Sequence, residues 1–309
     1  MKILMFGPLP PRVGGVSKSV ETLLNALKVK GIESSIILNF STFKPFFKRY
    51  DIVHIHYSKT WKRILGLLIG KIVAKKTILT LHGKEFYGDN SGADFSFSTR
   101  ITAMLSDGII FLNQIAKDRY MSLFSNNIIL DSIFMEGVLF KESKGKKYIQ
   151  RQKDKTYILV YAFDRIIKNS KDVYGVDFIL KNVSKFDQKY MIVLVDINQA
   201  YKSEVDRINS ESLVYLGCEV DFLSLLSEVD IYLRPTTTDG NSVALQEALM
   251  LGKRVLASDV VSRPKEATVY KSENFNDLFT KLENIEDNSG KFKPNSVDEY
   301  IVFCKKTLR

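Results

Sequence analysis

Residues 231–270 read IYLRPTTTDGNSVALQEALMLGKRVLASDVVSRPKEATVY, and this stretch decides what fold is expected of the whole chain. A short β-rich run, Ile231–Leu233, leads into a polar loop. A helical pattern then begins at Ser242, which is a good N-cap residue, and Gly252 stands where a C′ glycine belongs. A second buried strand, Arg254–Ala257, completes a β-α-β unit. In open α/β sheets, ligands bind at the carboxyl edge of such strands.

This unit carries two carboxylates, Asp239 in the loop and Glu247 in the helix, with seven residues between them. The free N–H groups at the start of the helix can hold an anion. The arrangement suits a sugar-nucleotide, with the sugar at Asp239, the diphosphate at Gly240, Asn241 and Ser242, and the ribose hydroxyls at Glu247. The alternative is an N-terminal acid followed by an exposed helix Glu.

The stretch resembles the nucleotide-binding motif of retaining glycosyltransferases with the GT-B fold, and it is most similar to glycosyltransferase family 4. In that family an acid and Gly are followed by Glu-Ala, a Gly and a strand ending in Ala-Ser. Here the motif reads Asp239-Gly240, Glu247-Ala248, Gly252 and Ala257-Ser258. The family usually has Glu as the first acid, so Asp239 is one methylene shorter.

The resemblance implies two Rossmann-like, doubly wound parallel-sheet domains that face a cleft. It implies that the second domain holds the nucleotide and the first domain holds the acceptor. The expected reaction is transfer of a sugar from a nucleotide-sugar donor to a saccharide or lipid-linked acceptor, with retention of configuration, in cell-surface polysaccharide or glycan synthesis. No metal is implied, because the chain has no Asp-x-Asp, and no cofactor, because the nucleotide-sugar is a substrate.

Length and composition agree with a two-domain globular protein. The chain has 309 residues, enough for two domains of about 150 residues each, with 45% hydrophobic and 26% charged residues. Two cysteines, Cys218 and Cys304, form no disulfide framework. Neither a signal peptide nor an apolar run of spanning length is visible. We therefore expect a cytoplasmic protein, with peripheral attachment to the inner face of the cell membrane left open.

The first half alternates strands with helices, which predicts a parallel, doubly wound sheet. The expected strands are Lys2–Gly7, Glu33–Leu38, Asp51–Tyr57, Thr77–Leu81, Asp107–Leu112 and Asn127–Ser132. Gly14 and Gly15 follow the first strand and precede a helix. A tight turn explains a Gly pair on its own, but the resemblance implies that these two glycines face the donor diphosphate.

Three histidines lie in this half. His54 and His56 alternate onto one face of the third strand, where a structural role is expected because no third ligand stands at metal spacing. His82 follows the fourth strand at its carboxyl end. The resemblance implies that a His at this place contacts the transferred sugar, so His82 is the preferred functional candidate.

The polar, charged run Lys141–Lys155 is the best domain boundary. The expected domains are therefore residues 1–145 and 146–295. Residues 296–309 are expected to form a C-terminal helix. In GT-B proteins the final helix often crosses back to the first domain, where Tyr300 and Phe303 would pack.

The second half opens with the expected strand Thr156–Phe163, followed by Arg165. In the resembled family an Arg after this strand and a Lys before a Gly clamp the donor diphosphate. Arg165 fits the first role, whereas Tyr174 occupies the place before Gly175. Lys171, six residues after Arg165, is then the candidate lysine. A solvated basic loop is the alternative.

Two basic segments, Lys44–Arg49 and Lys59–Lys76, suit an anionic membrane surface. The alternative for the second is an ordinary helix packed on the sheet by Ile64, Leu67, Leu68 and Ile72. The net charge of +10 would also suit nucleic acid, but no nucleic-acid motif is present. We therefore expect a small ligand rather than a nucleic-acid partner.

Two other functions remain open on the same evidence. One is a GT-B-shaped module that binds a sugar-nucleotide without turnover, which the shorter Asp239 favours slightly. The other is a sugar-nucleotide epimerase, because this fold hosts more than one chemistry.

Overall fold

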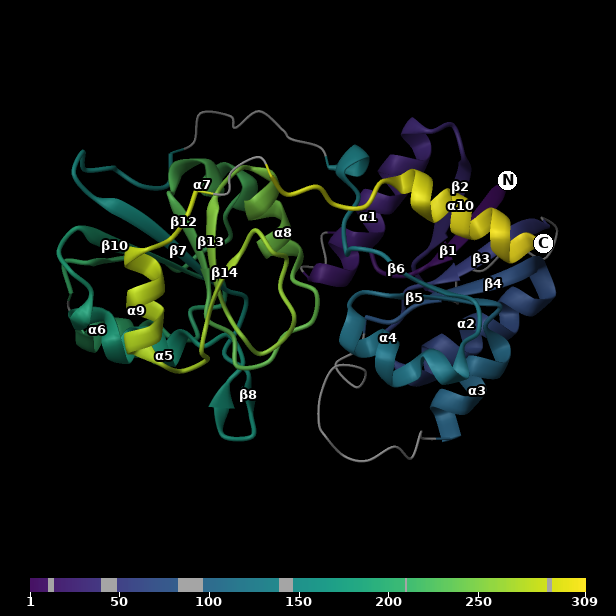
Figure 1. Ribbon diagram of the computed structural model, residues 1–309, viewed down its shortest axis with the longest axis horizontal. Coiled ribbons are helices and arrows are strands. Elements are labelled where there is room, and N and C mark those ends of the chain that lie inside the picture. Colours follow the sequence, from purple (N-terminus) through teal and green to yellow (C-terminus); the bar gives the residue numbers. More distant parts are fainter. Residues whose placement is uncertain (11–13, 40–48, 83–96, 139–146, 209, 288–290) are drawn as a thin grey trace. The chain divides into compact units, whose positions relative to one another are not determined.

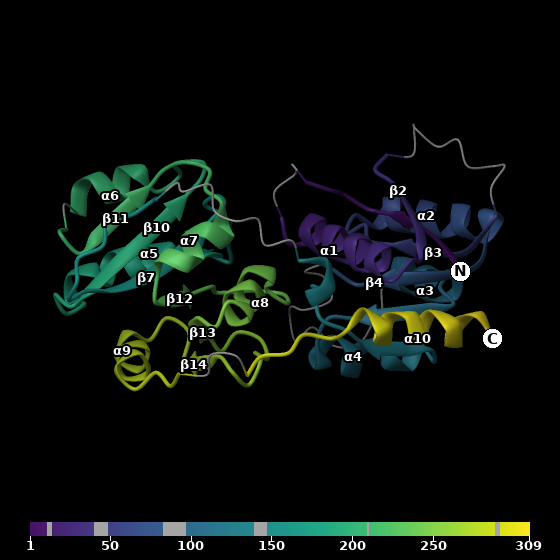
Figure 2. The same ribbon diagram turned by 90° about the horizontal axis from the view of Figure 1, so that it is seen from above.

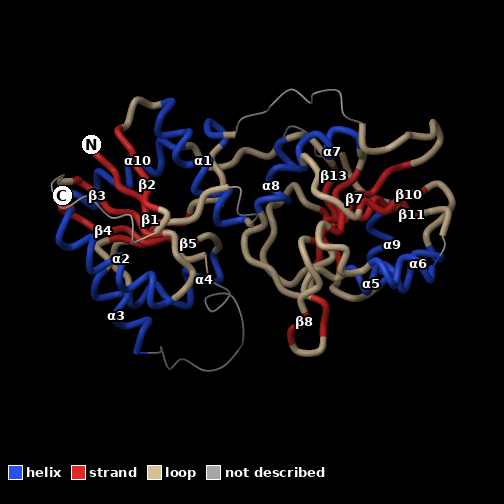
Figure 3. The backbone as a smooth tube through the Cα atoms, turned by 180° about the vertical axis from the view of Figure 1, so that it is seen from behind, coloured by secondary structure: helices blue, strands red, loops and turns tan. Residues whose placement is uncertain are grey.

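In the computed structural model, the described residues are 1–10, 14–39, 49–82, 97–138, 147–208, 210–287 and 291–309 (Figure 1). Packing divides the chain into two compact units. The first unit comprises Met1–Leu139, Gly240–Val243 and Pro294–Arg309, and the second unit comprises Phe140–Asp239 and Ala244–Lys293. Strands and helices alternate in both units (Figure 3).

The first unit is built on a parallel sheet with the strand order β2-β1-β3-β4-β5-β6. Its strands are β1 (Lys2–Phe6), β2 (Glu33–Ile37), β3 (Tyr50–Ile55), β4 (Ala74–Thr80), β5 (Gly108–Phe111) and β6 (Asn127–Ile129). Its helices are α1 (Gly15–Val29), α2 (Thr60–Val73), α3 (Phe97–Leu105), α4 (Gln114–Tyr120) and α10 (Val297–Leu308), with short 3-10 turns η3 (Met121–Leu123) and η4 (Met135–Gly137).

Both faces of this sheet are covered, which explains why strands such as β1 (KILMF) and β5 (GIIF) are apolar at nearly every position. Alternate residues of β1 point to opposite faces. Ile3 and Met5 pack with α1 and α10, whereas Leu4 and Phe6 pack with residues of α2 and α4. Figures 1 and 2 show α1 and α10 on one side of the strands, and Figure 1 shows α2, α3 and α4 on the other.

The second unit repeats this architecture, with the strand order β11-β10-β7-β12-β13-β14. Its strands are β7 (Thr156–Ala162), β10 (Tyr190–Asp196), β11 (Leu213–Leu216), β12 (Ile231–Arg234), β13 (Arg254–Ser258) and β14 (Thr268–Tyr270). Its helices are α5 (Val176–Asn182), α6 (Lys202–Ile208), α7 (Phe222–Glu228), α8 (Val243–Met250) and α9 (Phe275–Glu283), with the 3-10 turn η5 (Val183–Lys185).

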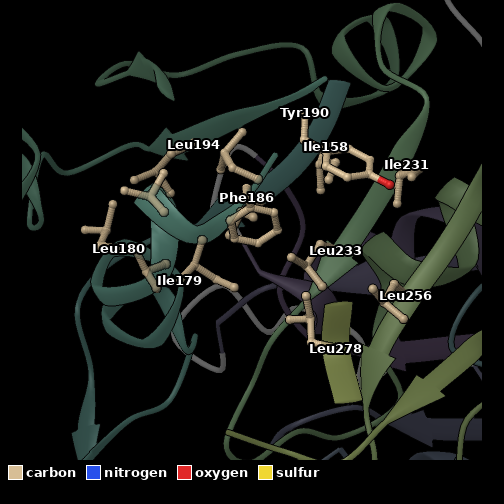
Figure 4. Close-up of a cluster of buried hydrophobic side chains, with 14 of the residues drawn as sticks. Ile158, Ile179, Leu180, Phe186, Tyr190, Leu194, Ile231, Leu233, Leu256 and Leu278 are labelled. Atoms are coloured by element: carbon tan, nitrogen blue, oxygen red, sulfur yellow. The ribbon is translucent and has the colours of Figure 1, made fainter. Parts of the chain in front are cut away.

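One face of the second sheet carries the larger apolar core of this unit. Ile158, Leu233 and Leu256, from three neighbouring strands, pack there with residues of α5 and α9 such as Ile179 and Leu278 (Figure 4). The opposite face packs against α7 and α8. A small antiparallel hairpin, β8 (Ile167–Lys168) and β9 (Lys171–Asp172), stands apart from the sheet.

The predicted fold class, two doubly wound parallel sheets, is confirmed. Every strand expected from the sequence is present, with ends shifted by a few residues. β14 and the hairpin were not predicted, because both are too short to show an apolar period. None of the described helices combines the length and apolarity that crossing a membrane requires.

The alternative for the basic segment Lys59–Lys76, an ordinary helix packed on the sheet by Ile64, Leu67, Leu68 and Ile72, is wrong in part. α2 ends at Val73, and Ala74 already belongs to β4. Leu67 is buried as expected, but Leu68 and Ile72 are exposed. The inner face of α2 is made instead by residues that include two glycines, Gly66 and Gly70. A Cβ at Gly70 would lie 2.7 Å from the Thr77 side chain, so this helix lies very close to the sheet.

The C-terminal helix α10 packs on the first sheet through a buried polar contact. The Tyr300 hydroxyl lies 3.0 Å from Nδ1 of His54, whose Nε2 lies 2.7 Å from Oγ1 of Thr80. Tyr300, Phe303 and His54 are all buried. The histidine is therefore satisfied on both ring nitrogens, as a structural histidine should be.

We predict that Tyr300→Phe lowers the free energy of unfolding by about 1–2 kcal/mol, because it leaves one buried nitrogen of His54 without its partner. Tyr270→Phe is the matched control, since the Tyr270 hydroxyl is buried and has no hydrogen-bond partner among the described residues. The control should be neutral. Urea unfolding of both variants measures the difference, and equal stabilities would contradict the prediction.

Candidate functional site

In the second sheet, the direction in which the chain adds successive strands reverses between β7 and β12. The chain passes from β7 to β10 and β11 on one side, and then crosses to β12, β13 and β14 on the other. Such a switch point leaves a crevice at the carboxyl ends of the two strands, where α/β proteins bind ligands. Arg165 follows β7 and Asp239 follows β12, so both candidates lie on segments that leave this edge.

Asp239 is the centre of a buried ionic network. Its carboxylate accepts from Nε and Nη2 of Arg234, both at 3.1 Å, and from Nη1 of Arg263 at 2.8 Å. Thr236 Oγ1 donates to the same carboxylate at 3.3 Å. Arg263 also donates to the carbonyl of Ser258, at the end of β13. The side chain of Arg263 is 2% exposed and that of Asp239 is 8% exposed, so this network is shielded from water.

The network fixes the charge state of Asp239. Burial alone would raise the pKa of this carboxyl, but the charges and hydrogen bonds of Arg234 and Arg263 outweigh burial and lower its pKa to about 2. For Arg234, burial acts to lower the pKa, and Asp239 more than compensates, so the pKa is raised. Asp239 and Arg234 are therefore both charged at neutral pH.

Arg234 and Arg263 were not among the predicted site residues. A signal was present, because Arg234-Pro235 and Arg263-Pro264 each stand near the end of a strand, and the two strands are neighbours in the sheet. Parallel neighbours bring such residues to one edge. The predicted sugar contact of Asp239 remains a prediction, and the structure adds that this carboxylate is held by two arginines.

The loop after β12 is also fixed by the segment before α5. Thr237 donates through its N–H to the carbonyl of Val173 at 3.1 Å and through its hydroxyl to that of Asp172 at 2.8 Å. Gly175 adopts a φ of 71°, and a Cβ there would lie 1.8 Å from the carbonyl oxygen of Pro235. Only glycine fits this position, which brings the two loops into contact.

Helix α8 begins directly after Ser242, where the N-cap was predicted. Its end is the expected glycine stop. Gly252 has a φ of 68°, its N–H donates to Leu249, and the N–H of Lys253 donates to Ala248. This pair of bonds is a Schellman motif.

The other predicted nucleotide-binding residues lie in or just before α8. Glu247 is buried, so the alternative of an exposed helix Glu is wrong. Ser242 is also buried. The side-chain amide of Asn241 donates to the carbonyl of Leu112 at 3.0 Å, and Ser132 donates to the carbonyl of Asn241 at 2.9 Å. These contacts place Gly240–Val243 within the first unit.

Both predicted cations of the second unit already hold carboxylates. Arg165 donates to Glu204 at 2.6 Å and to Asp177 at 3.0 Å. Lys171 forms an ion pair with Glu273. Both cations are partly exposed, which leaves them accessible to an anionic ligand. A diphosphate at either cation would compete with these carboxylates.

The first unit has an equivalent edge with its own candidates. Its switch point lies between β1 and β3. Gly14 is the N-cap of α1 and Gly15 is its first residue. His82 follows β4, and its Nε2 lies 3.1 Å from Nδ1 of His56, which follows β3. Burial lowers the pKa of His82 to about 4, so His82 is neutral at pH 7 and can donate or accept one hydrogen bond per ring nitrogen.

Within the described ranges, no cluster of three His, Cys, Asp or Glu side chains is arranged to hold a metal ion. The predicted basic segment Lys44–Arg49 lies outside the described residues except for Arg49.

No protein-family model matches this chain. A curated relative, an uncharacterized 41.2 kDa protein in the cps region of Klebsiella pneumoniae, is 23% identical over 250 residues, which are 77% of this chain and 67% of that protein. The N,N'-diacetylbacillosaminyl-diphospho-undecaprenol alpha-1,3-N-acetylgalactosaminyltransferase of Campylobacter jejuni is 29% identical over 156 residues. That match covers 47% of this chain and 40% of the transferase, so it spans less than half of either protein.

Solved structures show the fold. HepE of Anabaena, in complex with UDP, superposes with a TM-score of 0.64 at 14% identity, over 92% of this chain and 90% of HepE. HepE is a GT-B glycosyltransferase, so the likeness shows that this chain has the GT-B fold.

Proposed function

We propose that this chain, which has the GT-B fold, is a retaining glycosyltransferase that needs no metal and moves a sugar from a nucleoside-diphosphate donor to a saccharide or lipid-linked acceptor. The observation that carries the proposal is the switch-point edge of the second unit. There the loop with Asp239 leads into α8, and α8 buries Glu247. A buried carboxylate one turn inside a helix is the acceptor that paired ribose hydroxyls require.

The other residues have roles that follow from their chemistry. Arg165 and Lys171 are the cations for the diphosphate, helped by the N–H groups at the start of α8. They would stabilise charge on the leaving group, which is the task that a metal performs in other transferases. Gly14 and Gly15 at the start of α1 would approach the same diphosphate. His82 and Asp239 would contact the transferred sugar.

The acceptor is proposed to be a saccharide or a lipid-linked saccharide of cell-surface polysaccharide or glycan synthesis. Two comparisons support this class. The Campylobacter jejuni relative is named as a transferase for a diphospho-undecaprenol acceptor. The lipopolysaccharide outer core galactosyltransferase WaaB has a similar structure, with a TM-score of 0.58 at 12% identity.

The test of the proposed function is a transfer assay with a panel of UDP-, GDP- and ADP-sugars, run with lipid-extracted and soluble saccharide acceptors. NMR of the product reports the anomeric configuration, and excess EDTA tests metal independence. We expect donor consumption with retention in the presence of EDTA. Tight binding of a sugar-nucleotide without consumption would favour the binding module, and conversion of the donor sugar without an acceptor would favour the epimerase.

We predict that Glu247→Ala weakens nucleoside-diphosphate binding by about 1.5–3 kcal/mol, roughly 10- to 100-fold in Kd, because the ribose hydroxyls lose a charged acceptor. Calorimetric titration measures the change. Glu211→Gln is the matched control, since Glu211 is exposed and precedes β11 at the opposite, amino-terminal edge of the sheet. Equal affinities of wild type and a folded Glu247→Ala chain would place the ribose elsewhere.

A further inference from the structure

Helix α2 carries large apolar side chains on the face that points away from the sheet. Trp61, Leu65, Leu68 and Ile72 are all exposed, and Ile72 is 72% exposed. Their spacing of four, three and four residues places them along one stripe of the helix. Meanwhile the inner face is built from residues that include Gly66 and Gly70. Four of the large apolar residues of this helix are therefore turned outward, whereas Leu67 and Val73 are buried.

Helix α3, which packs beside α2, repeats the feature (Figure 1). Phe97 is 80% exposed and Met104 is 83% exposed. They are seven residues apart, so they lie on one face of α3. Isolated exposed apolar residues are common on protein surfaces, but a stripe on each of two neighbouring helices marks an interaction surface.

The charged residues within α2 and α3 are all of one sign. Neither α2 nor α3 contains Asp or Glu. Lys59 and Arg100 are exposed, and the ammonium of Lys62 lies 5.5 Å from the centre of the Trp61 ring. At the far end of α2, Lys71 is paired with Asp107, so its charge is partly balanced. The two helices thus combine exposed apolar side chains with exposed cationic ones.

We propose that the α2–α3 surface docks on an anionic lipid bilayer, with the stripe Trp61–Leu65–Leu68–Ile72 inserted among the acyl chains. Helices that lie in the membrane interface typically carry apolar side chains on one face, with Lys and Arg beside them. Trp is favoured at the level of the headgroups, and the stems of Lys reach from buried positions to anionic headgroups. A second copy of this chain fits less well, because it would bring two cationic surfaces together.

Membrane docking rests on the proposed function in one respect only. If the protein is a transferase, docking would bring it to a lipid-linked acceptor. Docking itself is measured without any transfer. Vesicle binding can therefore fail while transfer to a soluble acceptor survives, and the reverse can also occur.

The experiment uses the full chain and vesicles of phosphatidylcholine with or without phosphatidylglycerol. Trp61 is the only tryptophan of the sequence, so its fluorescence reports this stripe alone. We expect co-sedimentation with the anionic vesicles, a blue shift of the emission, and quenching by brominated acyl chains. Leu68→Glu with Ile72→Glu should weaken binding at least about tenfold. Both positions are exposed, so the unfolding midpoint should not change.

Val302→Glu is the matched control, because Val302 is an exposed apolar residue of α10, which covers the other face of the sheet. It should bind vesicles like the wild type. The proposal is overturned if the wild type does not bind anionic vesicles or if the double Glu variant binds them as tightly as the wild type does. It is also overturned if binding leaves the Trp61 emission unchanged. A dimer in sedimentation velocity that the double Glu variant abolishes would show that the stripe serves a second copy instead.

Discussion

Asp239→Asn is expected to destabilise the protein by about 3–5 kcal/mol. The substitution removes the negative charge from a buried ionic network and leaves two buried arginines without it. The Asp239 carboxylate holds Arg234 and Arg263 together. With the amide in place of the carboxylate, two guanidinium groups share a site that excludes water. Asp239→Glu keeps the charge but adds a methylene to a packed site, so it should cost less, about 1–3 kcal/mol.

Urea unfolding of the full chain measures these differences. Asp206→Asn is the matched control, because Asp206 is an exposed acid paired with Lys202 on α6 and should contribute at most about 1 kcal/mol. A double variant, Asp239→Asn with Arg263→Met, removes an acid and a base together. It should be more stable than Asp239→Asn alone, since only one buried cation is left. A double variant that is less stable would show that the arginines do not depend on Asp239.

The same network makes stability depend on pH in a definite direction. The pKa of Asp239 in the folded chain is lowered to about 2, below its ordinary value of 3.8. A lowered carboxyl pKa contributes stability above the ordinary value, and that contribution is lost as the pH falls through the folded value. We expect wild type to lose about 2 kcal/mol more than Asp239→Asn between neutral pH and pH 2. Parallel pH profiles of the two proteins would contradict this account of the carboxylate.

The fold could be predicted because its signals are local. Strand, glycine and helix patterns such as Val255–Ser258 and the Gly252 stop each depend on residues near one another in the chain. The order of strands follows from the alternation of strands and helices, which favours a parallel, doubly wound sheet. Glu247 could be identified as a candidate because the number of residues between it and Asp239 is read directly from the sequence.

The ionic network could not be predicted in the same way, because Arg263 lies 24 residues after Asp239. The two meet only because β12 and β13 are parallel neighbours, so that the segments leaving them share an edge. The contact of His82 with His56 has the same origin, since β3 and β4 are neighbours. In both cases the residues are present in the sequence, but which of them come into contact depends on the order of the strands in the sheet.

The α2 stripe was misjudged for a different physical reason. An apolar helix beside a sheet is normally taken to bury its largest side chains. Gly66 and Gly70 are both buried on this face, and a Cβ at Gly70 would lie 2.7 Å from the Thr77 side chain and 3.0 Å from that of Val53, so no space is left for a large side chain there. Leu68 and Ile72 are therefore left outside. A pair of glycines four residues apart is the sequence signal that the usual assignment should be reconsidered.

The contacts of Arg165 fit two roles, a structural tie between helices and a clamp for the diphosphate. Its guanidinium is shared by Glu204 and Asp177, and it also lies 5.5 Å from the centre of the Tyr201 ring. These contacts alone would explain a structural arginine that ties α5 to α6. A diphosphate clamp requires more, namely that the same cation binds the leaving group as its charge develops.

We predict that Arg165→Ala lowers kcat about 10²- to 10³-fold, because a cation aimed at the leaving diphosphate is lost, and that Arg165→Lys restores only part, since a point charge replaces a two-pronged donor. Steady-state transfer assays measure both. Arg151→Ala is the matched control, because Arg151 pairs with Asp230 at the amino-terminal edge of β12 and should keep full turnover.

Glu204→Gln separates the two explanations of Arg165. If the arginine only ties helices together, removing Glu204 should affect stability much as removing Arg165 does, and turnover should fall little in either variant. If it binds the diphosphate, Glu204→Gln releases the cation from a competing carboxylate. Nucleoside-diphosphate affinity should then hold or rise while Arg165→Ala loses turnover. Full activity in a folded Arg165→Ala chain would remove this residue from the site and leave Lys171 and the start of α8 to hold the diphosphate.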